Sequence, residues 1–428
     1  MDTRGKNLEA ASDVVQVDRL NADFYKHIQY PGPLTMLDRL AQPDFWSRML
    51  AHDVWHVGDP SVLPHGSVIW VAGCGRNQAL ITALKFPMSQ VIGSDLSEAS
   101  LEACRENAEQ LGVRNLELRR ESINDVTYRD QYDYIICTGV IHHNADPRVP
   151  LAKLSRAMKP SGILELMVYN EYHRFHPTAF QQVIRTLCGT SSEPDYVKEL
   201  PWARKLVKAF TSPSTMDGFL SGYRRDNVRD AYFGDSLLQP VEHSFTIKTL
   251  DELARACELE LATFCVDQFS RASGTVTWNL HLDDAELREK YFSLPDVTRW
   301  HLANLMLQER SPRLWFYLQR RDCPRTRKAE QEICADFLDS QFQKTATTRE
   351  VYTLGPDGKY SSSGKQLPFP GRMRPASEAA AKVYDALDET QPIRKTFARV
   401  GLDTSFPVVD DVRIHLATSA FPFMMRKT

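Results

Sequence analysis

The sequence predicts an α/β protein built on a doubly wound, mostly parallel sheet. Short apolar segments alternate with segments of helical spacing from residue 67 to residue 170. This rhythm is typical of parallel strands, because each crossover needs a helix to return the chain to the same edge of the sheet. Two glycines, one residue apart, follow the first apolar segment in VIWVAGCGRNQ, residues 68–78. Such a turn at the end of a first strand indicates a ligand site at that edge.

Length and composition set the class of protein. The 428 residues are enough for two or three domains, and 42% apolar with 25% charged residues is typical of a globular chain. A net charge of −3 disfavours nucleic acid or an anionic membrane as partner. No apolar run nears the roughly 20 residues of a membrane helix, and the N-terminus lacks a signal-peptide core. We therefore expect a cytoplasmic protein, with its eight scattered cysteines reduced and no metal site.

The elements of the core are expected in strict alternation. Residues 1–64 have mostly helical spacing and are expected to form an N-terminal helical lid, and residues 65–170 the ligand-binding core. The expected strands of this core are residues 67–73, 90–97, 116–122, 132–140 and 163–170. Helices are expected between them, over Gln78–Lys85, Glu98–Leu111 and Leu151–Met158.

The rest of the chain departs from this rhythm. Residues 171–247 read as a helical insertion that caps the sheet, because 77 residues are too many for a simple loop. Residues 248–321 are expected to complete the core, with strands at the end of 249–267, at 274–282 and at 311–321, and a helix over 283–309. Residues 322–428 are expected to form a small C-terminal domain, in which 355–375 is a turn-rich, mobile stretch.

The glycine turn and one acidic residue predict a nucleotide site. Gly73 and Gly75 lack the Cβ that would hold a ligand away from the backbone. Asp95 ends the second strand about 20 residues later, where a carboxylate can accept both hydroxyls of a ribose. Asp95 also fits a helix cap, but Ser97 supplies a separate capping side chain, so both functions are compatible.

At this point the chain resembles a known family. The segments VAGCGRN, SDLS, ESI, YDYIICTGVIHH and KPSGILELMVYN are together similar to class I S-adenosylmethionine-dependent methyltransferases. The resemblance covers about residues 20–321, and the cap and C-terminal extension resemble a bacterial subgroup with an insertion after the fifth strand. It implies a seven-stranded Rossmann-like sheet and S-adenosyl-L-methionine as cofactor. The cofactor contacts that it implies are Gly73, Cys74, Gly75, Asp95, Leu96, Ser122, Ile123, Thr138, Gly139, and one of Tyr25 and Tyr30.

Two positions depart from the family pattern. Asn77 stands where a third glycine is usual, and Ser122 where an acidic residue is common. Asn tolerates positive φ, so the turn does not require that glycine. The same fold also binds nicotinamide cofactors, but their fingerprint needs a glycine where Gln78 stands, so NAD is disfavoured.

The candidates for chemistry follow the fourth and fifth strands. His142 and His143 are candidate general bases, since imidazole titrates near neutral pH, although the pair could equally pack beneath the cofactor. The candidate substrate contacts are Tyr169, Glu171, Tyr172 and His173. The spacing of His173 and His176 invites a metal site, but no acidic partner accompanies it. Further along, Asp230, Asp235, Glu242 and His243 either contact substrate or tether the cap.

Three functions remain open at this level. The first is methyl transfer to a small molecule, such as a bacterial specialised metabolite, because capping insertions build enclosed sites. The second is a protein or peptide methyltransferase in which residues 322–428 bind the polypeptide. The third is a cofactor-binding regulator without catalysis. The basic stretch RRDCPRTRK has no accompanying RNA-binding motif, so nucleic acid is disfavoured, and the sequence does not fix the oligomeric state.

Overall fold

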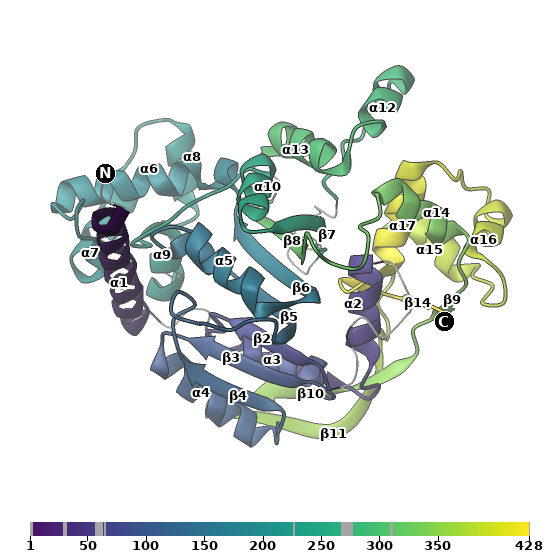
Figure 1. The fold of residues 1–428 in the computed structure, drawn as a ribbon, viewed down its shortest axis with the longest axis horizontal. Helices are drawn as coiled ribbons and strands as arrows, with labels where there is room; N and C mark the ends of the chain where they lie inside the picture. The colour runs from purple at the N-terminus through teal and green to yellow at the C-terminus, as the bar shows by residue number, and fades with distance from the viewer. Residues whose placement is uncertain are drawn as a thin grey trace.

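The centre of the fold is a seven-stranded sheet, whose strands are labelled in Figure 1. The computed structural model describes residues 3–28, 32–55, 63, 66–225, 227–266, 277–308 and 311–427. The strand order is β4-β3-β2-β5-β6-β8-β7. The five strands from β4 to β6 are parallel, whereas β8 is antiparallel to both of its neighbours. These strands are β2 (Val68–Ala72), β3 (Gln90–Asp95), β4 (Leu116–Arg120), β5 (Tyr132–Thr138), β6 (Met158–Tyr169), β7 (Leu259–Phe264) and β8 (Arg313–Arg320). The predicted doubly wound, mostly parallel sheet is confirmed.

Helices cover both faces of the sheet and bury two apolar cores. One face packs against α2 (Phe45–Trp55), α3 (Gln78–Lys85) and α4 (Glu98–Gln110), and the other against α5 (Arg148–Ala157), α10 (Ile247–Ala256) and α13 (Asp296–Leu307). The central strands are apolar on both sides because each side faces a helical layer. Trp70 on β2 and Trp300 on α13, both fully buried, are among the largest side chains of the core.

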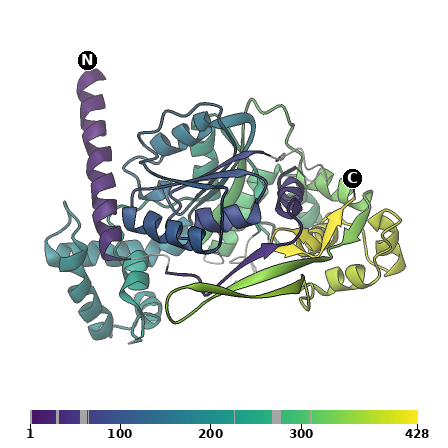
Figure 2. The same cartoon turned by 90° about the horizontal axis from the view of Figure 1, so that it is seen from below.

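A helical cap lies at one end of the sheet. It consists of α6 (Glu171–Cys188), α7 (Tyr196–Ala209), α8 (Thr215–Ser221) and α9 (Asp230–Leu237), which follow β6 in the chain. The N-terminal helix α1 (Thr3–His27) joins it, since Phe24 and Ile28 pack in the same apolar cluster as the cap helices. Figure 2 shows the C-terminal end of α1 beside the cap and its N-terminal end projecting away. The carboxyl ends of the parallel strands therefore meet α1 and the cap.

The structure differs from the expected lid over residues 1–64 and the separate domain over 322–428. Residues Met36–Leu40 form a strand, β1, which pairs antiparallel with β10 (Thr347–Leu354). The turn-rich stretch that we expected to be mobile forms β11 (Tyr360–Phe369), which completes this three-stranded sheet. The local sequence of 355–375 favours turns, but β11 within it pairs with β10. Because β10 also pairs with β1, which lies more than 300 residues earlier, long-range pairing determines the conformation of this stretch.

The remaining C-terminal elements pack on the core beside α2. They are α14 (Glu330–Leu338), β9 (Phe342–Lys344), α15 (Glu378–Asp385), α16 (Ile393–Arg399), α17 (Phe406–Leu416), β12 (Ala417–Thr418), β13 (Phe421–Pro422) and β14 (Met424–Arg426). The carboxylate of Asp53 on α2 accepts the backbone N–H of Ser419, with N to Oδ2 3.0 Å apart. Burial raises the pKa of this carboxyl to about 7, although the bonds from Ser419 act in the opposite direction.

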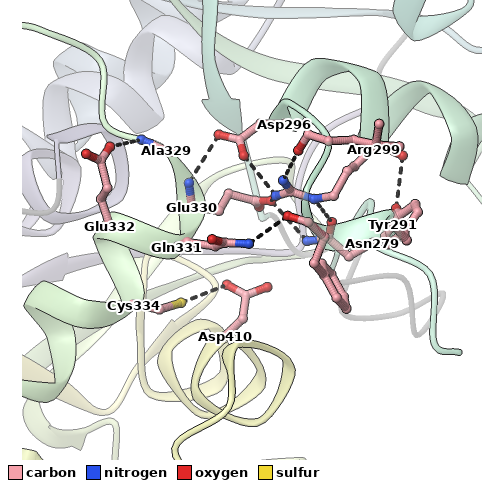
Figure 3. A network of polar contacts seen from close by, with 12 residues as sticks. Asn279, Tyr291, Asp296, Arg299, Ala329, Glu330, Gln331, Glu332, Cys334 and Asp410 are labelled. Atoms are coloured by element: carbon pink, nitrogen blue, oxygen red, sulfur yellow. Dashed lines mark hydrogen bonds and ion pairs between the residues drawn. The ribbon is translucent and has the colours of Figure 1, made fainter. Parts of the chain in front are cut away.

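A buried polar network joins α13 to α14 (Figure 3). The Arg299 guanidinium donates to Asp296 at 2.8 Å and to Glu330 at 2.5 Å, and all three side chains are at most 3% exposed. Its Nε lies 3.2 Å from the side-chain oxygen of Asn279. Buried charges persist only when they are paired in this way. The C-terminal elements are therefore part of one body with the core rather than an independently attached module.

Two further expectations concern the region around residue 280. Residues 277–282 are not a strand, and the other residues of the expected strand 274–282 lie outside the described part of the chain. The expected helix over 283–309 is divided into α12 (Ala285–Phe292) and α13, because Pro295 precedes the second helix and cannot continue the first. Among the described residues, no helix combines the length and apolarity that crossing a membrane requires.

Candidate functional site

The turn after β2 places bare backbone at the carboxyl edge of the sheet. Gly73 and Gly75 have φ of +69° and +52°, a region that side chains rarely adopt. A Cβ added to Gly73 would lie 2.4 Å from Cγ2 of Val140, so this glycine also permits close packing between two loops. Asn77 has φ −130°, which means that the third position of the turn needs no glycine. We expected Asn77 to replace the third glycine by tolerating a positive φ, but the turn does not use a positive φ at this position.

Asp95 fixes this turn to the end of β3. Its Oδ2 accepts the backbone N–H of Gly75 at 2.7 Å, and its Oδ1 accepts that of Ser97 at 2.8 Å. Burial raises the pKa of the Asp95 carboxyl, while these two backbone donors act against the rise. The cap of α4 is Ser97, whose hydroxyl accepts from Ser100 N–H at 3.3 Å. A carboxylate has about four acceptor positions, so Asp95 retains capacity for further donors.

The end of β5 completes the crevice. The chain leaves β2 toward β3 and β4 on one side and occupies β5 and β6 on the other, so strand order reverses between β2 and β5. Thr138 and Gly139 end β5 at this point, and the Thr138 hydroxyl lies 2.7 Å from Nε2 of Gln78 on α3. Open α/β sheets bind ligands at such a reversal. Gly73, Gly75 and the ends of β3 and β5 therefore surround one location.

Three other predicted cofactor contacts contribute differently. The Cys74 side chain is buried in the core between β2 and α3, and burial raises the pKa of its thiol, so only its backbone faces the turn. Ile123 is buried after β4, and Leu96 is half-buried after β3. Tyr30 lies outside the described residues.

Helix α1 brings a carboxylate to the end of β4. The Ser122 hydroxyl donates to Asp18 Oδ2 at 2.5 Å, and the Asn124 amide donates to Asp18 Oδ1 at 3.1 Å. Burial raises the pKa of Asp18, partly offset by these bonds. Sequence reasoning missed Asp18, because no spacing rule connects positions that are 104 residues apart. The serine that departs from the family pattern is therefore paired with an acidic residue from elsewhere in the chain.

Two more side chains hold α1 across the edge of the sheet. The Asn21 amide donates to the carbonyl oxygen of His143 at 2.8 Å. One turn later, the Tyr25 hydroxyl accepts from Nε2 of Gln239 at 3.0 Å. Burial raises the pKa of Tyr25 well above its usual value, and the charges of Asp235 and Asp95 add to the rise. Tyr25 thus joins α1 to the cap.

The two histidines predicted as bases are buried and weakly basic. Nδ1 of His143 lies 2.9 Å from the carbonyl oxygen of Val241, and burial lowers its pKa to about 4. Burial lowers the pKa of His142 well below the usual value, and its neighbours His143 and Arg174 add to this effect. Imidazoles in this state stay neutral at physiological pH and accept protons poorly. The geometry thus favours packing and hydrogen bonding over general-base chemistry for this pair.

Of the four predicted substrate contacts, Tyr169 packs against the histidine pair, whereas the other three lie at the start of α6. The Tyr169 ring lies 4.0 Å from the His142 ring and 4.5 Å from the Arg174 guanidinium, centre to centre. Glu171 is exposed, and Tyr172 and His173 are half-buried. Because these three start a helix, their side chains point in different directions around its axis. Only Tyr169 extends the site along the sheet edge.

The sequence left open whether four residues contact substrate or tether the cap, and the structure places them in different surroundings. They are Asp230, Asp235, Glu242 and His243. Glu242 and Arg174 form a buried bidentate ion pair, and Nε2 of His243 lies 3.0 Å from the carbonyl oxygen of Asn144. The ion pair joins α6 to the segment after α9, and the His243 contact joins that segment to the loop after β5. Asp230 pairs with Arg204 at the surface. Asp235 is different, since it is buried on α9 and accepts from Nε2 of Gln239 at 2.8 Å.

No cluster of three or more His, Cys, Asp or Glu with metal-binding geometry occurs among the described residues.

Comparisons with known proteins show which proteins this chain is similar to. A family model described as a methyltransferase domain matches residues 70–200. An uncharacterized protein of Synechococcus sp. is 26% identical over 242 residues, which cover 55% of this chain and 56% of that protein. The ubiquinone biosynthesis O-methyltransferase of Acinetobacter baylyi is 29% identical over 159 residues, 36% of this chain and 66% of that enzyme. The matches thus span only about half to two thirds of these relatives.

Solved structures share the fold. PKMT2 from Rickettsia typhi, solved in complex with AdoHcy, has a TM-score of 0.53 at 15% identity, covering 76% of this chain and 64% of that chain. A second structure of PKMT2 has a TM-score of 0.51 at 16% identity, covering 85% and 71%. Residues 70–200 thus match a methyltransferase domain, and the seven-stranded sheet has the Rossmann-like fold of the class I S-adenosylmethionine-dependent methyltransferases.

Proposed function

We propose that this protein transfers a methyl group from S-adenosyl-L-methionine to a small-molecule acceptor held between the sheet edge and the cap. The observation that carries the proposal is the meeting of the Gly73–Gly75 turn with Asp95 at the reversal of strand order. When bound, the cofactor supplies an electrophilic methyl group on a sulfonium. The protein's task is then to hold both reactants in line and to keep water out.

The residues at the edge fit this cofactor. Each oxygen of Asp95 holds one backbone N–H and keeps lone pairs for the two ribose hydroxyls. Gly73 and Gly75 offer approachable backbone to the amino-acid portion, with Thr138 and Gly139 facing it across the crevice. Leu96 and Ile123 supply apolar surface for the adenine. The Asp18–Ser122 pair supplies an acceptor for its amino group, in place of the acidic residue that is common after this strand.

The cap supports a small acceptor. The buried Arg174–Glu242 pair holds α6 to the segment that follows α9, Arg174 also donates to the Ser236 carbonyl on α9, and the rings of His142 and Tyr169 lie together at the sheet edge. Enclosed sites with few polar groups suit small ligands. The O-methyltransferase name of the Acinetobacter baylyi relative favours an oxygen acceptor. A role in the biosynthesis of a specialised metabolite is consistent with this arrangement.

The second candidate is a protein or peptide methyltransferase that binds its substrate through residues 322–428. Deleting these residues would not test it, since deletion removes β10 from β1 and Glu330 from Arg299. The close integration of this region with the core offers no separate polypeptide-binding module, and so favours the small acceptor.

The test follows the label from methyl-labelled S-adenosylmethionine. The full chain is first titrated by calorimetry with S-adenosylmethionine and S-adenosylhomocysteine, and binding of both at micromolar concentrations is expected. It is then incubated with separated small-molecule and protein fractions of a bacterial extract. Label in the small-molecule fraction supports the proposal, and label in the protein fraction supports the second candidate. Binding without any transfer would indicate a regulator, and no binding at millimolar cofactor would reject the cofactor assignment.

A further inference from the structure

The cap carries a buried carboxylate, Asp235, at the end of the sheet where the two predicted bases, His142 and His143, are weakly basic. Asp235 lies on α9, is 6% exposed, and accepts from Gln239 Nε2 at 2.8 Å. The same Nε2 donates to the Tyr25 hydroxyl at 3.0 Å, so both amide hydrogens of Gln239 are occupied and hold these two side chains beside each other. Tyr25 lies on α1 one turn after Asn21, whose amide donates to the His143 carbonyl after the end of β5, so this group adjoins the proposed cofactor site.

Polar atoms around this group still have unused hydrogen-bonding capacity. Oε1 of Gln239 and both ring nitrogens of His142 are buried without a hydrogen-bond partner in the described part of the chain. Buried polar atoms are nearly always hydrogen-bonded, so each unpaired one needs an explanation. A ligand with hydroxyl groups would satisfy a carbonyl oxygen and a neutral imidazole together, since a hydroxyl both donates and accepts. The rings of Tyr25 and Tyr169 would suit an aromatic body for that ligand.

We propose that Asp235 is the catalytic base that takes the proton from an acceptor hydroxyl of phenol type. The O–H bond of the acceptor breaks, its electron pair stays on the oxygen that is methylated, and the proton goes to a carboxylate oxygen of Asp235. A lone pair of that oxygen would form the new O–CH₃ bond as the S–CH₃ bond of bound S-adenosylmethionine breaks, with the electron pair of the broken bond staying on sulfur. The methylated product and S-adenosylhomocysteine then leave, and Asp235 returns the proton to solvent. This inference rests on the proposed methyltransferase function and adds the acceptor class and its base.

The electrostatic surroundings of Asp235 fit this role. Burial raises the pKa of its carboxyl to about 7; nearby Arg174 and the Gln239 bond oppose the rise, as does Arg313 on β8, and Glu242 adds to it. On α1, Tyr25 also faces this carboxyl, with the charge of Asp235 acting on its hydroxyl. A base with a pKa near the operating pH transfers protons most efficiently.

The test compares Asp235→Asn with Asp230→Asn, a matched change on the same helix whose carboxylate is 63% exposed and pairs with Arg204. The probes are catechol, 4-hydroxybenzoate and phenol, with methyl-labelled S-adenosylmethionine. We expect the wild-type kcat to fall as pH drops through about 7. In Asp235→Asn, kcat should fall at least about a hundredfold and lose this acid limb. Asp230→Asn should behave as wild type, and cofactor affinity should be unchanged in both variants.

A second readout does not depend on turnover. In protein labelled at the aspartate carboxyl carbons, the NMR signal that vanishes in Asp235→Asn should titrate near pH 7. A midpoint at the ordinary aspartate value, or full activity of Asp235→Asn, would overturn the inference. So would transfer to amines but to none of the phenols. Failure of wild-type protein to bind the cofactor by calorimetry would instead reject the proposed function itself, so the two failures are distinguishable.

Discussion

Replacing Asp95 by alanine is the sharpest test of where the cofactor binds. The substitution removes an acceptor from the N–H groups of Gly75 and Ser97, which the carboxylate holds at 2.7 Å and 2.8 Å. It also removes the proposed acceptor for the ribose hydroxyls. Both losses act on the same ligand, because the turn that Asp95 positions is the turn that the cofactor would contact.

The expected magnitude follows from the bonds involved. A hydrogen bond to a charged group contributes about 1.5–3 kcal/mol, against about 1 kcal/mol for a neutral pair. Loss of a single ribose bond therefore costs about 1.4 kcal/mol or more, which is roughly a tenfold loss of affinity. Looser positioning of the turn adds to this value, since cofactor binding must then also order Gly75. We expect a fall of at least about tenfold in the affinity for S-adenosylhomocysteine.

Calorimetric titration with S-adenosylhomocysteine measures this change directly. Glu98→Ala is the matched control. Glu98 is a carboxylate three residues away that is 45% exposed, and its contact with Arg120 is weak, with Nε and Oε2 3.9 Å apart. Thermal unfolding of both variants separates loss of binding from loss of fold. Wild-type affinity in a folded Asp95→Ala protein would refute the assignment of Asp95 and with it the proposed position of the cofactor.

Three further predictions concern contacts that the tertiary structure revealed. Asp18→Asn should weaken cofactor binding severalfold, on the order of 1 kcal/mol, whereas Asp23→Asn, an exposed change on the same helix, should not; equal affinities by calorimetry would remove α1 from the site. Arg299→Leu leaves Glu330 buried without its cation and Asp296 with Arg327 alone, and should lower the free energy of unfolding in urea by about 3–5 kcal/mol. The exposed Arg288→Leu should stay close to wild type. The folded state keeps Asp53 protonated up to about pH 7, whereas the unfolded chain releases this proton near pH 4, so the contribution of Asp53 to stability should fall as pH rises between these values. In denaturation curves measured across this range, Asp53→Asn should show a smaller fall of unfolding free energy with pH. An unchanged fall would contradict the raised pKa.

Local sequence determined the core of this protein. The alternation of apolar segments with helical spacing placed the strands and helices between residues 67 and 170 to within a few residues. The glycines at 73 and 75 and the carboxylate at 95 could be predicted as neighbours, because parallel strands of one sheet end at one edge. These features follow from periodicity and strand direction, which short windows of sequence carry.

Only the tertiary structure decided the contacts between distant segments. The pairing of β1 with β10 and the approach of Asp18 to Ser122 join residues separated by more than 100 positions, and no local pattern encodes such a meeting. The same holds for the basicity of the candidate groups. His142 and His143 are ordinary imidazoles in the sequence, and burial is what makes them poor bases while it brings Asp235 to about neutral pH. Residue type fixes which proton can move, but the surroundings that folding assembles fix the pH at which it does.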